Sequence, residues 1–195
     1  LACARDLLTH RGSRLYVYRR ALLSRLQAVM RMNKAQKTAL MSAFTAAAVI
    51  FSYVEFLLPV PIIPIANFKL GFSNIAILAV LYLYTPKDAF AVMTARTVLN
   101  ALLFSGIIPL AMSLTGGILS LAVMSLLKRT QKFSIVGVSV AGATAHNIGQ
   151  CIAAAMIVQT VSIVAYLPIM MVLSVVCGVL ISVASGFIIK IIKNG

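Results

Sequence analysis

The chain has 195 residues, of which 62% are hydrophobic, and it carries seventeen Lys and Arg against three Asp and Glu, for a formal net charge of +14. A soluble domain of this size needs many more carboxylates on its surface, whereas a chain surrounded by acyl chains does not. The composition therefore excludes an ordinary soluble protein and indicates a polytopic membrane protein. The basic residues lie between apolar runs, which favours anionic lipid headgroups over nucleic acid as the partner.

Residues 1–29 differ from the rest, because they carry six Arg and no apolar run long enough to cross a membrane. They fit a basic amphipathic helix lying on anionic lipid, or an extension upstream of a natural start at Met30 or Met32. We favour the extension. Residues 30–195 are expected to form one six-helix membrane domain.

Six apolar segments follow, and they predict an all-α bundle of six transmembrane helices. The second and third segments have only about 15 residues each, so they would cross steeply or incompletely. The expected spans cover residues 38–58, 70–84, 89–104, 107–127, 135–157 and 168–189.

The basic residues alternate between connections and so predict the orientation. The third and fifth connections carry no Lys or Arg, and the first carries only Lys69. The positive-inside rule then places both termini in the cytoplasm of a bacterial cell membrane, with connections one, three and five outside. The inner charges are Arg31, Lys34, Lys37, Lys87, Lys128, Arg129, Lys132, Lys190 and Lys193.

The first outer connection reads PVPIIPIANFKLG over residues 59–71. Its three prolines forbid a regular helix, because each lacks an N–H donor and fixes φ. The segment is also too apolar to extend into water. We expect a lid, or a partly re-entrant loop, over the outer mouth of the bundle; the alternative is a rigid surface turn.

Polar side chains at membrane depth normally face the bundle interior. Arg96 and Asn100 share a helix face at i,i+4 and lie ~12 and ~18 Å from the cytoplasmic end at 1.5 Å per residue. The AHNIGQ run of the fifth span lies roughly 18–24 Å from the inner side, in the outer half of the membrane. Glu55 and Gln159 are also expected at membrane depth but are not assigned to the site. The remaining polar residues at this depth are Asn67, Lys69, Asn74, Arg96, Asn100, His146, Asn147 and Gln150.

These eight residues are the expected substrate site. Arg supplies a planar fork suited to carboxylate or phosphate, and amides supply donors and acceptors. The site would hold a small anionic or mixed-polarity molecule delivered from outside. Alternatively, the same groups bond to one another and lock the helices, with Glu55 neutralising Arg96 or Lys69.

Small residues mark close helix contacts. Ala35, Ala39, Ala43 and Ala47 repeat every four residues along the first span, a pattern that lets another helix approach, within the bundle or from a partner protein. Gly116, Gly117 and Gly178 are expected to be close-packing points inside the bundle.

Catalytic motifs are missing from the sequence. It contains no GxxxxGK[ST] phosphate loop, no HExxH and no carboxylate pair suited to magnesium. The three cysteines form no CxxC pair, and Cys151 and Cys177 lie in apolar stretches, as small buried hydrophobes do. We expect a non-catalytic chain without cofactor or metal, whose energy comes from partners.

Four runs carry a resemblance: PIANFKLGFSNIAIL, TPKDAFAVMTARTVLNALLFSG, SLTGGILSLAVMSLLKR and VSVAGATAHNIGQ. Over residues 33–193 the chain resembles the bacterial heptaprenyl diphosphate synthase component I family, also called the Gx transporter family. That family is similar to the S components, the substrate-binding subunits of energy-coupling-factor (ECF) transporters, which are six-helix membrane proteins.

The resemblance implies vitamin uptake with a transmembrane T component and two cytoplasmic ATPases. It also implies that an AxxxA pattern, which Ala39 and Ala43 fit, contacts the T component. Prenyl diphosphate synthases resemble one another in Asp-rich motifs, and this sequence has none. We therefore expect an S-component-like importer subunit. The alternative is a non-catalytic membrane subunit associated with prenyl diphosphate or quinone biosynthesis; a channel or proton-coupled carrier is disfavoured by the scarcity of buried carboxylates.

Overall fold

A computed structural model of the chain describes residues 33–57, 71–159 and 161–194. Helices are the only regular secondary structure in these residues, which confirms the predicted all-α class. The expectations for residues 1–29, for the proline-rich connection and for Asn67 and Lys69 fall outside the described residues. The elements are α2 (Lys34–Leu57), α3 (Asn74–Leu83), α4 (Pro86–Asn100), a π-helical turn (Ala101–Ser105), α5 (Ile107–Thr130), α6 (Ile135–Val158), a 3-10 segment (Val161–Tyr166) and α7 (Leu167–Asn194).

The chain divides into two compact units, Leu1–Leu40 and Met41–Gly195. Residues 33–40, the described part of the first unit, hold the beginning of α2. The helix packing and the candidate site lie within the second unit.

Local sequence explains where the helices begin. α3 starts at Asn74 because Gly71, with φ of 89°, turns the chain and its carbonyl accepts from the Asn74 amide at 2.9 Å. α4 starts at Pro86, before the predicted span, because Thr85 and Asp88 form a capping box around that first turn. The helices α5 and α7 run past the predicted ends of their spans, to Thr130 and Asn194.

The helix composition places the protein in a membrane. Among the described residues, α2, α5 and α7 are long and apolar enough to cross a bilayer, and α3 is apolar but has 10 residues. Large apolar side chains also face outward, since Leu102, Ile107 and Met156 are 78%, 82% and 75% exposed. Such a surface is unfavourable in water and is solvated well by acyl chains. The chain is therefore a multi-pass membrane protein.

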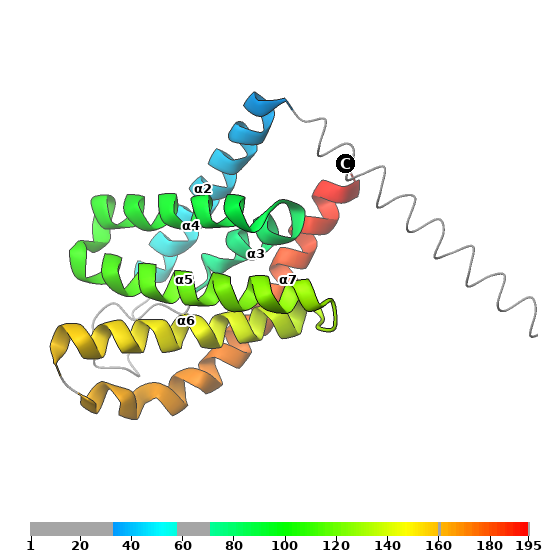
Figure 1. Cartoon of the computed structure of the whole chain (residues 1–195). Coiled ribbons are helices and arrows are strands. Elements are labelled where there is room, and N and C mark those ends of the chain that lie inside the picture. Colours follow the sequence, from blue (N-terminus) through cyan, green and yellow to red (C-terminus); the bar gives the residue numbers. More distant parts are fainter. Residues whose placement is uncertain (1–32, 58–70, 160, 195) are drawn as a thin grey trace, which may run out of the picture. The chain divides into compact units, whose positions relative to one another are not determined.

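Helices α5 and α6 lie side by side, and α7 packs against α6 (Figure 1). A Cβ on Gly149 of α6 would lie 2.7 Å from the Gly116 Cα of α5, so these two backbones touch. A Cβ on Gly178 of α7 would lie 2.6 Å from the Val140 Cα of α6, and one on Gly117 would lie 2.7 Å from a Met93 sulfur. The predicted close packing at Gly116, Gly117 and Gly178 is confirmed.

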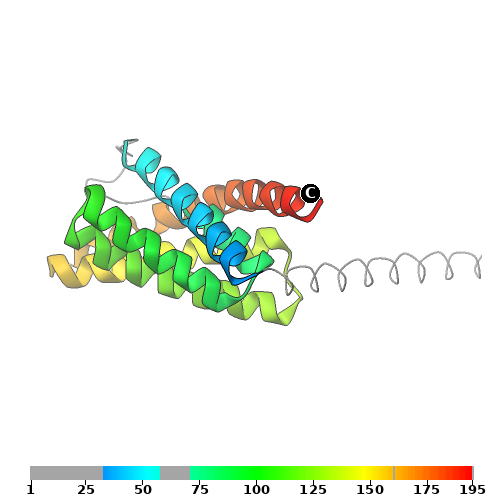
Figure 2. The same cartoon turned by 90° about the horizontal axis from the view of Figure 1, so that it is seen from above.

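The short helix α3 lies at the centre of the packing. Its first eight residues, from Asn74 to Leu81, are all buried, and it contacts α4 and α7. Ser185 of α7 donates a hydrogen bond to the Ile75 carbonyl at 2.9 Å. The view from above shows α4 running alongside α5 (Figure 2). A helix too short to span a bilayer is therefore shielded by the surrounding protein over its first eight residues.

Candidate functional site

Arg96 lies on α4 with its side chain in the interior, and only 3% of the residue is exposed. Its Nη1 donates to the Ser73 hydroxyl, beside the start of α3, and lies 3.5 Å from the Ser52 hydroxyl of α2. Its Nε and Nη2 are buried and find no hydrogen-bond partner among the described residues. The described residues therefore leave two donor positions of this guanidinium without an acceptor. Each buried donor without a hydrogen bond costs about 1–3 kcal/mol of stability.

Glu55 of α2 is buried next to this arginine and attracts it electrostatically. The Glu55 carboxylate also accepts a hydrogen bond from the Gly71 amide at 2.5 Å, which joins the end of α2 to the turn before α3. In the described part of the site a buried cation and a buried anion therefore lie near each other, and their charges offset when both are ionised.

His146 and Gln150 bring α6 to the same region. They share a helix face, and their Nε2 atoms lie 3.1 Å apart. A Cβ on Gly71 would lie 3.7 Å from the His146 Cδ2 and 3.1 Å from the Asn74 Nδ2, so His146 and Asn74 both border that turn. A Cβ on Gly116 would lie 3.1 Å from the His146 Nδ1. Residues from α2 to α6 therefore meet around Gly71.

Asn147 faces a different way from its neighbour His146. Its Nδ2 donates to the Ser174 hydroxyl at 2.7 Å and to the Met170 carbonyl at 3.2 Å, both on α7. This geometry ties α6 to α7. Asn100 is buried one turn beyond Arg96 on α4, on the same face.

Amide oxygens form a second set of open positions. The side-chain oxygens of four buried amides have no hydrogen-bond partner in the part of the chain that is described: Asn74, Asn100, Asn147 and Gln150. Buried amide oxygens normally find a donor. Asn147 bonds to α7, so the site presents N–H donors at Arg96 and the acceptor oxygens of Asn74, Asn100 and Gln150. This combination suits a small molecule with both an anionic or carbonyl group and its own donors.

The described residues also include side chains of the metal-binding types, cysteines and the alanine stripe. No group of three or more His, Cys, Asp or Glu side chains gathers there as a metal site would require. Cys151 and Cys177 are free and buried, as predicted. Of the alanine stripe, Ala35 and Ala39 belong to the first unit; in the second unit, Ala43 is exposed and Ala47 is half-buried.

Comparison with known proteins identifies the family of this chain. Residues 44–188 match the family described as heptaprenyl diphosphate synthase component I. The chain belongs to that family. No curated protein and no solved structure matches it.

Two residues of the site in this family member did not stand out in the sequence. Ser52 and Ser73 both contact the Arg96 guanidinium, but isolated serines in apolar helices are common and carry no distinctive spacing. One signal was present for each. Ser52 precedes Glu55 by three residues and so shares its helix face, and Ser73 directly precedes Asn74.

Proposed function

We propose that this membrane protein is the substrate-binding subunit of an ECF-type importer, which captures a small vitamin-like or anionic compound at the outer face and passes it inward with the help of ATPase partners. The observation that carries the proposal is the buried Arg96, whose Nε and Nη2 lack hydrogen-bond partners among the described residues. A ligand that accepts from these two N–H groups would remove their desolvation penalty.

The surrounding groups define the ligand's chemistry. Glu55 offsets the charge of Arg96, so the site does not demand a strongly charged anion. The open oxygens of Asn74, Asn100 and Gln150 would accept from N–H or O–H groups of the ligand. We infer a ligand of mixed polarity, with a carboxylate or carbonyl against Arg96 and donor groups toward the amides.

The charges at the helix ends support an orientation with both termini in the cytoplasm. Cations lie at the start of α4, at the end of α5 and near the end of α7. The positive-inside rule is met if all three of these helix ends lie on the cytoplasmic side of the membrane. In this orientation the polar site lies toward the outer leaflet. The partners would be a T component, reached through the Ala39 and Ala43 face of α2, and two cytoplasmic ATPases. The chain itself would be non-catalytic and without a cofactor.

Native mass spectrometry of the purified full chain tests the proposal. We expect a small molecule to be retained by the wild type, to be lost in Arg96→Ala, and to be retained at least tenfold more weakly in Arg96→Lys, because an ammonium cannot supply the planar fork. Arg129→Ala, which removes an exposed cation on α5, is the matched control and should retain the molecule fully. Equal retention by Arg96→Ala and the wild type would contradict the proposal.

A second candidate function rests on the family description, which names a prenyl diphosphate synthase component. In that case the chain would be a non-catalytic membrane subunit that anchors an enzyme of prenyl diphosphate or quinone biosynthesis. Affinity purification from mild detergent separates the two candidates. A T component and ATPases that are lost in Ala39→Leu and Ala43→Leu support the importer, whereas a prenyl-transferring enzyme that remains in Arg96→Ala supports the anchor.

A further inference from the structure

Helices α6 and α7 pack against each other from Asn147 and Ser174 as far as Val140 and Gly178, and they separate beyond Gly178. At Gly178 an added Cβ would lie 2.6 Å from the Val140 backbone, and the Ser139 hydroxyl donates to the Gly178 carbonyl at 2.7 Å. Two turns later, at Gly186, an added Cβ would meet nothing within 4 Å. The divergence leaves an open groove of about 310 Å³ between the start of α6 and the last turns of α7.

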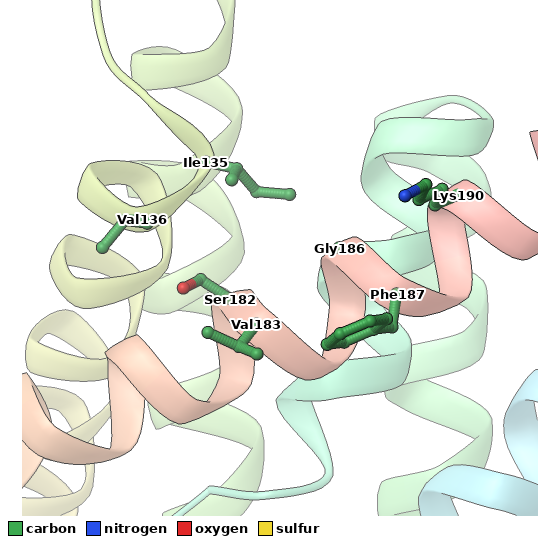
Figure 3. A pocket seen from close by; sticks show the side chains of 7 residues that line it. All are labelled: Ile135, Val136, Ser182, Val183, Gly186, Phe187 and Lys190. Carbon is green, nitrogen blue, oxygen red and sulfur yellow. The ribbon is translucent and has the colours of Figure 1, made fainter.

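The walls of this groove are apolar, and one end is charged. Ile135 extends from α6 toward α7, and Val183 and Phe187 line the α7 side (Figure 3). Ser182 also lines the groove, but its hydroxyl donates to the Val179 carbonyl at 2.7 Å. Lys190, one turn above Gly186, is the cation at the groove's rim.

We propose that this groove binds an anionic phospholipid, with one acyl chain along Ile135, Val183 and Phe187 and the phosphate against the Lys190 ammonium. An apolar trough offers nothing to a polar solute, and a single ammonium at its end complements one phosphate. Lys190 lies one turn, ~6 Å, before the end of α7 at 1.5 Å per residue, the depth at which a lysine reaches the headgroups. The proposal is independent of any cargo bound near Arg96.

Local charge selects this groove over a similar one. A groove of about 360 Å³ between α4 and α5 also has one lysine, Lys87, at its rim and apolar walls such as Phe90. There, however, Asp88 adjoins the lysine in the chain and adds a negative charge to the same first turn of α4, although it does not line that groove. Of the two carboxylates in the described residues, neither Glu55 nor Asp88 lines the groove at Lys190. Of these two grooves, the one at Lys190 is the one whose lysine has no acidic residue next to it in the chain.

Photo-crosslinking of the full chain in phosphatidylcholine vesicles tests the proposal. The vesicles contain a trace of phosphatidylglycerol or phosphatidylcholine with a photoreactive group on one acyl chain. Labelling at Val183 and Phe187 is compared with labelling at Val172, an exposed α7 residue outside the groove, which reports bulk lipid. We expect phosphatidylglycerol, and not phosphatidylcholine, to label the groove in excess of Val172.

Two variants assign that excess to the rim charge. Lys190→Gln should lower groove labelling by phosphatidylglycerol about fivefold, the factor that one basic residue contributes near an anionic headgroup. Arg129→Gln removes another exposed cation that does not line the groove and should leave the labelling unchanged. Both changes replace exposed side chains, so neither threatens folding.

Three results would overturn the proposal. Equal labelling by the two lipids would mean that the groove does not select charge. Unchanged labelling in Lys190→Gln would mean that Lys190 does not hold the phosphate. Absence of lipid labelling in the groove, with Val172 labelled normally, would mean that protein covers it, such as a helix of a partner or of a second copy.

Discussion

Two glycines on α7 provide a matched test of how closely α6 and α7 pack. A Cβ on Gly178 would lie 2.6 Å from the Val140 Cα, where ordinary contact begins at 3.4 Å. The obstructing atom belongs to the backbone and cannot rotate away, so the helices would have to separate by several tenths of an ångström. A Cβ on Gly186, two turns along the same helix, would meet nothing within 4 Å.

The expected magnitude follows from two opposing effects. Replacing Gly with Ala favours a helix by ~0.5–1 kcal/mol at either position, so this effect cancels when the two variants are compared. Overpacking at a tight contact costs ~1–3 kcal/mol. Gly186→Ala should therefore raise the free energy of unfolding slightly, Gly178→Ala should lower it, and the two variants should differ by ~1–3 kcal/mol.

Equilibrium unfolding in mixed micelles, followed by circular dichroism, measures both variants beside the wild type. The comparison needs no absolute stability, because both substitutions have the same chemistry and lie on the same helix. If Gly178→Ala proved as stable as Gly186→Ala, α6 and α7 would not meet through their backbones, and the groove that opens beyond that contact would lose its geometric basis.

Three further substitutions test other contacts by the same unfolding measurement. Arg96→Met should lower the free energy of unfolding by ~3–5 kcal/mol, because it removes a buried cation that attracts the buried Glu55 carboxylate. Adding Glu55→Gln should recover part of that loss, and strictly additive effects would contradict the coupling. Thr85→Ala removes the capping box of α4 and should cost ~1 kcal/mol, with a loss under 0.3 kcal/mol counting against that role. Lys128→Met removes a donor to the Leu81 carbonyl at the end of α3 and should cost ~0.5–1 kcal/mol, whereas the exposed Arg129→Met should cost little; equal effects would refute this role.

Features that depend on a single helix were predictable. Arg96 and Asn100 were expected on one face of α4 from their spacing, and both are buried. Gly116 and Gly178 were expected at helix contacts because only a residue without a side chain allows such approach, and both lie against backbone atoms of α6.

Features that depend on how two helices pack could not be predicted from the sequence. The AHNIGQ run grouped His146, Asn147 and Gln150 as one polar unit, yet the structure directs His146 toward the turn before α3, places Gln150 between His146 and Gly116 of α5, and directs Asn147 toward α7. Adjacent residues on a helix point about 100° apart, so a short polar run serves two neighbours at once.

The sequence by itself determined the membrane class, the helical segments and the residues that share a helix face, because these follow from hydropathy and from the 3.6-residue period of each helix. Tertiary structure alone decided that Ser52 and Ser73 meet Arg96, that Gly71 joins Glu55 to α3, and that α7 leaves α6 beyond Gly178. Those outcomes depend on how each helix is rotated and where it crosses its neighbours. Rotation and crossing are settled by the packing of segments far apart in the chain, which no local pattern encodes.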